Sequence, residues 1–291
     1  MAELRNAGSL YLILMGGEAM LSPYFWDIAL KANDLGFHVS MISNGLKIKD
    51  LDTAKKLKDF GIHNITFSVY SLDECIHDGA TKIKGSLQRT LEAIEFCDQA
   101  EIEVSINSLL RSDNIEKIFE VEDWALKKGY CYKFDPTITP KLNGDTSTLQ
   151  HRATREQLKN YYKTKVQRWE NGKPMPLSLQ SDNYVCNAAK GKCAVNPYGE
   201  LLACVEIRKP LGNLKDVSFE EAWNSAEAKK WREVKNKDIK GLSGKACSDF
   251  CDHCPGMAHN EHQDSFKVTN FDQMHAEVKM EVFNEHVPRK T

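Results

Sequence analysis

The sequence predicts an α/β protein in two parts, a (β/α) domain followed by a small cysteine-rich domain. Two observations support this fold class. Short apolar segments alternate with longer amphipathic segments from residue 10 to residue 134, which is the pattern of a parallel sheet with helical crossovers. Six of the nine cysteines then fall between Cys186 and Cys254, where strong strand and helix patterns are few.

The first part begins with what looks like the end of a helix at residues 1–7, and strands and helices then alternate. The expected strands are the apolar runs 10–14, 38–42, 64–69, 103–108 and 130–134. The expected helices are the stretches 23–35, 50–60, 86–100 and 114–128. Chemistry in such sheets lies at the carboxyl ends of the strands. The residues expected at that edge include Gly17, Glu18, Asn44, Ser68 and Asn107.

The second part is expected to start with a charged helix over about 154–170 and a linker at 171–176. A hairpin is expected over 193–204, then one helix over about 218–234 and a last helix over 268–287. The expected domains are a partial (β/α) barrel at 1–147, a linker helix and loop at 148–176, a cysteine-rich domain at 177–266 and a C-terminal helix at 267–291.

The composition is that of an ordinary soluble protein. With 291 residues, of which 41% are hydrophobic, the chain can bury a core for one large domain and a small one. The net charge of −2 gives no general attraction to nucleic acid or to anionic lipid. The longest apolar run, residues 10–15, is much shorter than a membrane span. We therefore expect a cytoplasmic protein with reduced cysteines.

The spacing of the late cysteines predicts a metal or iron–sulfur site. Twelve residues separate Cys186 from Gly199 and four more lead to Cys204, and two residues separate Cys251 from Cys254. Thiolates at such spacings bind zinc or iron–sulfur clusters. The candidate metal ligands are Cys186, Cys193, Cys204, Cys247, Cys251 and Cys254. Zinc is the rival interpretation, because His253, His259 and His262 lie close by, and six unpaired thiols are the third.

The sequence resembles the radical S-adenosylmethionine (SAM) enzymes with a C-terminal SPASM or twitch domain. Met15-Gly16-Gly17-Glu18 is similar to the family's GGE motif, and Ser43-Asn44-Gly45 follows the next strand in family order. The resemblance implies that this loop binds the methionine end of SAM, with Ser68 and Asn107 near the ribose and adenine. The residue types agree, because two glycines let a ligand approach the backbone and a carboxylate can pair with its ammonium. The implied SAM-binding residues are Gly16, Gly17, Glu18, Asn44, Ser68 and Asn107.

The segment from Cys186 to Gly256 resembles a SPASM domain over its whole length. This resemblance implies one [4Fe–4S] auxiliary cluster, held by Cys186, Cys204 and Cys254 with Cys193 or Cys251 as the fourth ligand. Full SPASM domains hold two auxiliary clusters. Here only three residues separate Cys247 from Cys251 and no cysteine follows Cys254, so a second cluster is not expected.

The family's three-cysteine loop, which binds the cluster that cleaves SAM, has no counterpart early in this sequence. The first cysteine is Cys75, and the chain starts at what looks like the end of the helix that follows that loop. We therefore expect an amino-terminally truncated family member that lacks the first strand. The apolar strand at 10–14 would then be an uncovered sheet edge, to which a partner chain could add.

The resulting functional expectation is an iron–sulfur protein with the architecture of a radical SAM enzyme. In its intact form such a protein modifies a peptide or protein substrate, while this chain alone is not expected to cleave SAM. The sequence singles out no catalytic side chain. The alternatives are a non-catalytic iron–sulfur protein that binds a partner chain and a structural zinc protein.

Overall fold

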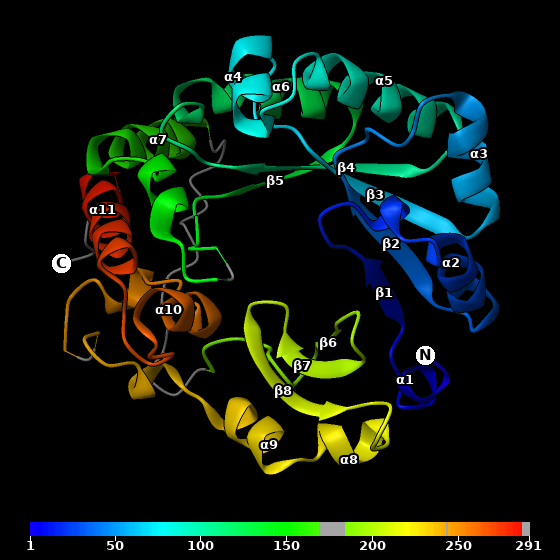
Figure 1. The fold of residues 1–291 in the computed structure, drawn as a ribbon. Coiled ribbons are helices and arrows are strands. Elements are labelled where there is room, and N and C mark those ends of the chain that lie inside the picture. Colours follow the sequence, from blue (N-terminus) through cyan, green and yellow to red (C-terminus); the bar gives the residue numbers. More distant parts are fainter. Residues whose placement is uncertain (142, 169–183, 243, 287–291) are drawn as a thin grey trace. The chain divides into compact units, whose positions relative to one another are not determined.

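The structure is a computed structural model that describes residues 1–141, 143–168, 184–242 and 244–286. The chain forms two compact units, residues 1–137 and residues 138–291 (Figure 1). None of the helices in the described ranges is long and apolar enough to cross a membrane. The bounds of the four domains expected from the sequence stay predictions.

Unit 1 is built on a five-stranded parallel sheet with the strand order β1-β2-β3-β4-β5. The strands are β1 (Tyr11–Leu14), β2 (His38–Ser43), β3 (Ile62–Ser68), β4 (Glu103–Leu109) and β5 (Cys131–Asp135). All five strands expected from the apolar runs are present. Sequential order in a parallel sheet is what successive right-handed crossovers produce, so the partial barrel predicted from the sequence is confirmed.

Apart from α1, which precedes β1, the helices follow the strands and lie along one face of this sheet (Figure 1). They are α1 (Ala2–Asn6), α2 (Phe25–Asp34), α3 (Leu51–Asp59), α4 (Glu74–Thr81), α5 (Ser86–Gln99) and α6 (Ile118–Lys128), with short 3-10 turns η1 (Ala19–Leu21) and η2 (Ile115–Lys117). Helix α3 begins after Asp50, whose side chain accepts a 2.8 Å hydrogen bond from the Thr53 N–H. Helix α4 was not expected from the sequence.

The two faces of the sheet differ in polarity. Residues that alternate along the central strands, such as Met41, Phe67 and Ile106, are at most 1% exposed and form the core beneath the helices. The opposite face carries polar side chains in register, with Ser68 beside Asn107. This face offers hydrogen-bonding groups, as a site for a polar ligand requires.

Strand β1 forms an edge of the sheet, because in the described residues it pairs only with β2. Its apolar side chains are open to solvent: Tyr11 is 73% exposed and Ile13 is 56% exposed, and the neighbouring Leu10 is 54% exposed. The uncovered apolar edge expected from the sequence is therefore present in the structure.

Unit 2 contains a three-stranded antiparallel sheet and a set of helices. The strands are β6 (Ala194–Val195), β7 (Glu200–Cys204) and β8 (Ile207–Asn213). The helices are α7 (Arg155–Arg168), α8 (Phe219–Trp223), α9 (Ala226–Glu233), α10 (Pro255–His262) and α11 (Asn270–His286), with 3-10 turns η3 (Thr146–His151), η4 (Asn236–Asp238) and η5 (Ser248–Phe250). The predicted hairpin and the predicted terminal helix are present.

The single helix predicted over 218–234 is wrong. The chain forms two helices there, because the Ser225 hydroxyl accepts a 3.3 Å hydrogen bond from the Ala228 N–H and caps a new helix, α9. Serine favours such caps over helix interiors. The linker predicted at 171–176 lies outside the described residues.

Helix α11 packs against α7 in unit 2. Lys159 and Lys163 of α7 both contact the carboxylate of Glu285, at 3.0 and 2.9 Å. At the other end of this helix pair, Arg152 and Glu261 form a largely buried ion pair at 2.6 Å. The Glu285 contacts fix α11 to α7, whereas the Arg152–Glu261 pair joins the segment before α7 to α10. This matters below because α11 also contacts the cysteine-rich segment.

Candidate functional site

The loop after β1 is tied to the loop after β2 through Glu18. One carboxylate oxygen of Glu18 accepts hydrogen bonds from the Ser43 hydroxyl at 2.9 Å and from the Asn44 N–H at 3.1 Å. The other oxygen accepts a bond from the Met20 N–H at 3.4 Å. The structure therefore gives this carboxylate protein partners, so its observed role is to hold two carboxyl-end loops together.

Gly16 and Gly17 lie exposed in the same loop. A Cβ atom at either position would meet nothing within 4 Å, so the space beside the backbone is open. The loop after β2 is more crowded. Gly45 there has φ of +80°, and a Cβ would lie 3.1 Å from the Ala93 methyl, so only glycine suits this position. The crowded loop after β2 is joined through Glu18 to the exposed loop after β1.

The remaining predicted residues of unit 1 follow the same sheet edge. Asn44 follows β2, and its side-chain oxygen accepts a 3.0 Å bond from the Leu46 N–H. Ser68 ends β3 and lies in register with Asn107 on β4. The side-chain oxygen of Asn107 is buried and has no hydrogen-bond partner within the described residues. A buried acceptor of this kind is costly unless a ligand or water supplies a donor.

Lys133 is a residue of this face that sequence reasoning missed. It lies on β5 in register with Asn107, so its side chain leaves the sheet on the same polar face. Lysines on an expected strand are common, and the signal that could have found it is the alternation of polar positions across three strands. This part of the sheet therefore combines the accessible backbone of Gly16 and Gly17, the unpaired side-chain oxygen of Asn107 and the lysine Lys133.

The β6–β7 hairpin brings two of the predicted ligands to one end. Strand β6 pairs antiparallel with β7, with Ala194 opposite Leu202. Cys193 directly precedes β6 and Cys204 ends β7, so both lie at the open end of the hairpin, opposite its turn. Asn196 shapes that turn, and its side-chain oxygen accepts from the N–H groups of Tyr198 and Glu200 at 3.0 Å.

The Cys186 segment reaches the same end of the hairpin. The Ala189 N–H donates a 3.0 Å bond to the carbonyl of Ala203, the residue before Cys204. The Cys186 sulfur itself accepts from the Ala188 N–H at 3.5 Å. Both alanines of this loop are buried, so the loop packs closely on β7. Cysteines 186, 193 and 204 are therefore gathered by backbone pairing.

Cys254 joins this group from helix α10. It occupies the N-cap position, without a side-chain capping hydrogen bond. Burial raises the pKa of the Cys254 thiol to about 11; the backbone N–H groups of Met257 and Gly256 at the helix start oppose that change, and nearby Glu206 and Cys204 add to it. A Cβ at Gly256 would lie 2.5 Å from the Glu206 carbonyl oxygen, so this turn packs directly against the segment after Cys204.

Cys247 and Cys251 occupy a different environment. They are 4% and 1% exposed and belong to an apolar cluster, whose other buried members are Ile239, Leu242, Val268 and Ala276. Burial raises the pKa of the Cys251 thiol to about 12, and the carboxylates of Asp272 and Asp252 raise it further. Both residues therefore resemble the buried thiols of a hydrophobic core.

The histidines do not assemble a zinc site. His253 has both ring nitrogens engaged, with Nε2 2.9 Å from the Ser265 carbonyl and Nδ1 3.3 Å from the Asp272 carboxylate. In the ranges that the structure describes, no three histidine, cysteine, aspartate or glutamate side chains could hold a single metal ion. An iron–sulfur cluster makes a different demand, because it spreads its four thiolates over separate irons.

The remaining cysteines lie in unit 1, in three separate elements. Cys97 is buried within α5, as expected for a small hydrophobe, whereas Cys75 and Cys131 are exposed. Their positions give no reason to group them.

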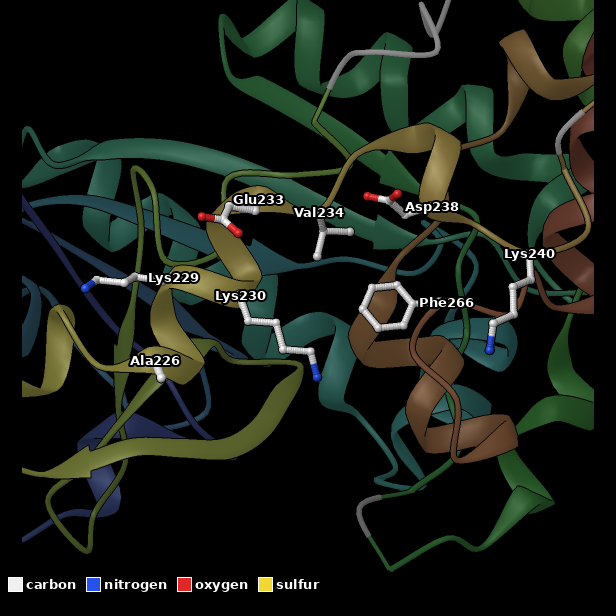
Figure 2. A pocket seen from close by; sticks show the side chains of 8 residues that line it. All are labelled: Ala226, Lys229, Lys230, Glu233, Val234, Asp238, Lys240 and Phe266. Atoms are coloured by element: carbon white, nitrogen blue, oxygen red, sulfur yellow. The ribbon is translucent and has the colours of Figure 1, made fainter.

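A groove of about 540 Å³ in unit 2 contains none of the predicted site residues (Figure 2). Its lining residues are Ala226, Lys229, Lys230, Glu233, Val234, Asp238, Lys240 and Phe266. Charges of both signs line it, and Lys240 is paired with Asp264 at 3.0 Å. The groove therefore provides no distinct set of metal or cofactor ligands.

The fold and these two groups of residues define a class: an α/β protein with a partial parallel barrel and a thiolate-rich C-terminal domain. Comparison with known families agrees. The radical SAM superfamily profile matches residues 1–125, and the profile of SPASM, an iron–sulfur cluster-binding domain, matches residues 186–255. The chain belongs to the radical SAM superfamily and carries a C-terminal SPASM domain.

Individual relatives are distant in sequence. An AdoMet-dependent heme synthase of Methanosarcina barkeri is 24% identical over 267 residues, which cover 83% of this chain and 76% of that protein. The sporulation killing factor maturation protein SkfB of Bacillus subtilis is 26% identical over 140 residues, or 48% of this chain and 34% of that protein. The solved structure of anSMEcpe with bound AdoMet has a TM-score of 0.69 at 14% identity, covering 98% of this chain and 85% of that one.

The cysteines at the open end of the hairpin fit an iron–sulfur cluster. The donor set is all thiolate, which iron–sulfur clusters require. Cys254 lies at the start of helix α10, where the backbone N–H groups of Met257 and Gly256 lower the pKa of its thiol against the effect of burial. The SPASM domain therefore supplies a chemically suitable iron–sulfur site.

Proposed function

We propose that this protein acts as a radical SAM/SPASM enzyme on a peptide or protein substrate, with Cys186, Cys193, Cys204 and Cys254 as the ligands of one [4Fe–4S] auxiliary cluster. The observation that carries this proposal is the open end of the β6–β7 hairpin, where Cys193 precedes β6, Cys204 ends β7 and Cys254 is a neighbour of Cys204. When bound, SAM supplies hydrogen-abstracting radical chemistry and the cluster supplies an electron acceptor or a binding point for the substrate.

Cys193 is the better fourth ligand than Cys251. Cys193 directly precedes the strand that pairs with the Cys204 strand, so the hairpin itself brings these two cysteines together. Cys251 instead lies in an apolar cluster with Cys247, next to carboxylates that oppose its ionisation. Burial raises the pKa of both the Cys193 thiol and the Cys251 thiol, so the position in the hairpin, and not the ease of ionisation, favours Cys193.

The carboxyl edge of the unit 1 sheet is the proposed SAM site. Gly16 and Gly17 leave open space beside their backbone for the methionine end of SAM. Glu18 positions this loop through its bonds to Ser43 and Asn44. On the neighbouring strands, Asn107 offers its unpaired side-chain oxygen as an acceptor, and Ser68 lies beside it in register.

The peptide or protein substrate is supported by the names of relatives. SkfB is a maturation protein of a killing factor, and anSMEcpe has also been solved with bound AdoMet and the Cp18Cys peptide. A second candidate is tetrapyrrole modification, because the sequence match over 83% of this chain is to an AdoMet-dependent heme synthase. Titration with a peptide and with a tetrapyrrole, monitored by fluorescence and by visible absorbance, separates the two.

The cleavage of SAM needs a second cluster. Cys75, Cys97 and Cys131 lie in three separate elements and form no three-cysteine loop. We therefore propose that ligands outside this sequence complete the SAM-cleaving cluster and that an added segment or partner chain covers the edge of β1. A non-catalytic iron–sulfur protein with a partner on this edge is the alternative.

The test is anaerobic reconstitution of the protein with iron and sulfide. We expect about four irons and about four sulfides per chain, as one [4Fe–4S] cluster requires. Zinc without sulfide would overturn the proposed cluster. Formation of 5′-deoxyadenosine from SAM by this chain alone would show that the ligands for SAM cleavage lie within it and would contradict the proposed need for others.

A further inference from the structure

The turn between Cys251 and Cys254 is held by helix α11 through both of its intervening side chains. Asp252 contacts the ammonium group of Lys279, and His253 contacts the carboxylate of Asp272. Lys279 and Asp272 are both on α11, about two helical turns apart. One helix thus contacts two consecutive residues of the turn that ends in a proposed cluster ligand.

Lys279 is a lysine in an unusual position, because it is only 9% exposed. Its ammonium group contacts Asp252, lies 3.4 Å from the Phe250 carbonyl oxygen and lies 5.9 Å from the centre of the Tyr162 ring. A buried ammonium is costly unless it is paired and hydrogen-bonded. These contacts therefore place a compensated positive charge directly beneath the Cys251–Cys254 turn.

His253 is the second anchor, and its side chain is 2% exposed. A backbone carbonyl can only accept, so Nε2 donates to the Ser265 carbonyl at 2.9 Å. Nδ1 faces the Asp272 carboxylate at 3.3 Å, and Asp272 also accepts from the Thr269 N–H at 3.4 Å. The His253 ring therefore bridges α11 and the segment that leads into it. Both contacts hold the backbone of the turn next to Cys254.

We propose that α11 is a positioning element for the iron–sulfur site, in which Lys279 and its partner Asp252 hold the Cys251–Cys254 turn and set the reduction potential of the cluster. This inference rests on the proposed function, because it takes Cys254 as a cluster ligand. The potential of an iron–sulfur cluster depends on nearby net charge, hydrogen bonds to sulfur and solvent exposure. Lys279 affects the net charge directly, and it affects the position of Cys254 by holding the turn through Asp252 and the Phe250 carbonyl.

The two members of the pair act on the potential with opposite signs. Lys279→Met leaves the Asp252 carboxylate uncompensated, which makes the cluster harder to reduce and shifts its potential to more negative values. Asp252→Asn leaves the ammonium unpaired and shifts the potential to more positive values. The double variant restores the charge balance, so its potential lies between those of the two single variants. Lys279→Arg keeps the charge and stays nearer to wild type than Lys279→Met.

The experiment is a redox titration of the reconstituted full chain, with iron and sulfide counted for every variant. The matched control is Lys240→Met, which breaks an exposed pair with Asp264 in the same unit and should leave the potential unchanged. Because the side chain of Asp252 is 75% exposed, Asp252→Asn should fold even if Lys279→Met does not. Either variant alone therefore tests the sign of the shift.

The outcomes separate this inference from the proposed function. A wild-type chain that binds no iron and sulfide overturns the proposed cluster and this inference with it. If the wild-type chain binds a cluster and both Lys279→Met and Asp252→Asn keep the wild-type reduction potential, only the role of α11 is overturned. Shifts of opposite sign in the two variants, with none in the control, support it.

Discussion

Cys254 and Cys251 are three residues apart and burial raises the pKa of both thiols, yet their neighbours differ. Cys254 lies at the start of helix α10 and neighbours Cys204. Cys251 is 1% exposed, packs with apolar residues and faces the carboxylates of Asp272 and Asp252. The comparison teaches that a C-x-x-C spacing permits a shared metal centre but does not establish one, because the packing around each sulfur decides which other thiols lie near it.

The largest effect is expected from removing the thiol of Cys254. Cys254→Ala should lose most of the iron and sulfide after reconstitution, because a [4Fe–4S] cluster needs a thiolate for each iron. Iron and sulfide analysis with visible absorbance provides the measurement. A variant that retains a full cluster would show that Cys254 is not one of its ligands.

A glycine substitution tests the packing that brings Cys254 to Cys204. Gly256→Ala would place a Cβ 2.5 Å from the Glu206 carbonyl oxygen, so the turn must move. We expect a loss of about 1–3 kcal/mol in unfolding free energy, as in other overpacked sites, together with a lower cluster content. Urea unfolding and iron analysis measure both.

The matched control is Gly191→Ala, in the loop between Cys186 and Cys193. A Cβ there meets nothing within 4 Å, so stability and cluster content should stay near wild type. Equal losses in the two glycine variants would indicate that close packing against Glu206 does not matter for the site.

The pH dependence of stability tests the thiol state of Cys251. Burial raises its pKa from 9.0 to about 12, so the folded chain keeps a proton that the unfolded chain releases in this window. Its contribution is fully present below pH 9 and is lost as the pH rises toward 12. The metal-free protein should therefore lose about 1.4 kcal/mol of stability per pH unit through this thiol.

Cys251→Ala should remove that part of the slope in urea unfolding between about pH 9 and about pH 10.5. At neutral pH the variant should cost about 1 kcal/mol, since it leaves only a small cavity. Identical slopes for the variant and the wild type would mean that Cys251 ionises as readily in the folded protein as in the unfolded chain.

The sequence was sufficient for the regular parts of the fold. Apolar runs such as 38–42 and 64–69 predicted the parallel strands, because a strand buried on one face beneath helices needs its apolar side chains there. It failed at Ser225, where a side-chain cap splits one helical pattern into two helices. Capping depends on a local competition between serine and the backbone that periodicity does not report.

The candidate sites were predictable in part. The cysteine pattern located the thiolate-rich segment, but spacing alone left Cys193 and Cys251 equivalent as fourth ligands. Their difference arises from tertiary packing, since the hairpin register places Cys193 and the apolar cluster encloses Cys251. Lys279 was likewise invisible in the sequence, because it reaches Asp252 from 27 residues away along the chain.

The most direct test of this account compares cluster content in Cys193→Ala and Cys251→Ala after anaerobic reconstitution. We predict that Cys251→Ala binds about four irons and about four sulfides, as the wild type does, and that Cys193→Ala loses most of both. The reverse result, a full cluster in Cys193→Ala and none in Cys251→Ala, would contradict the assignment of the cluster to the open end of the β6–β7 hairpin.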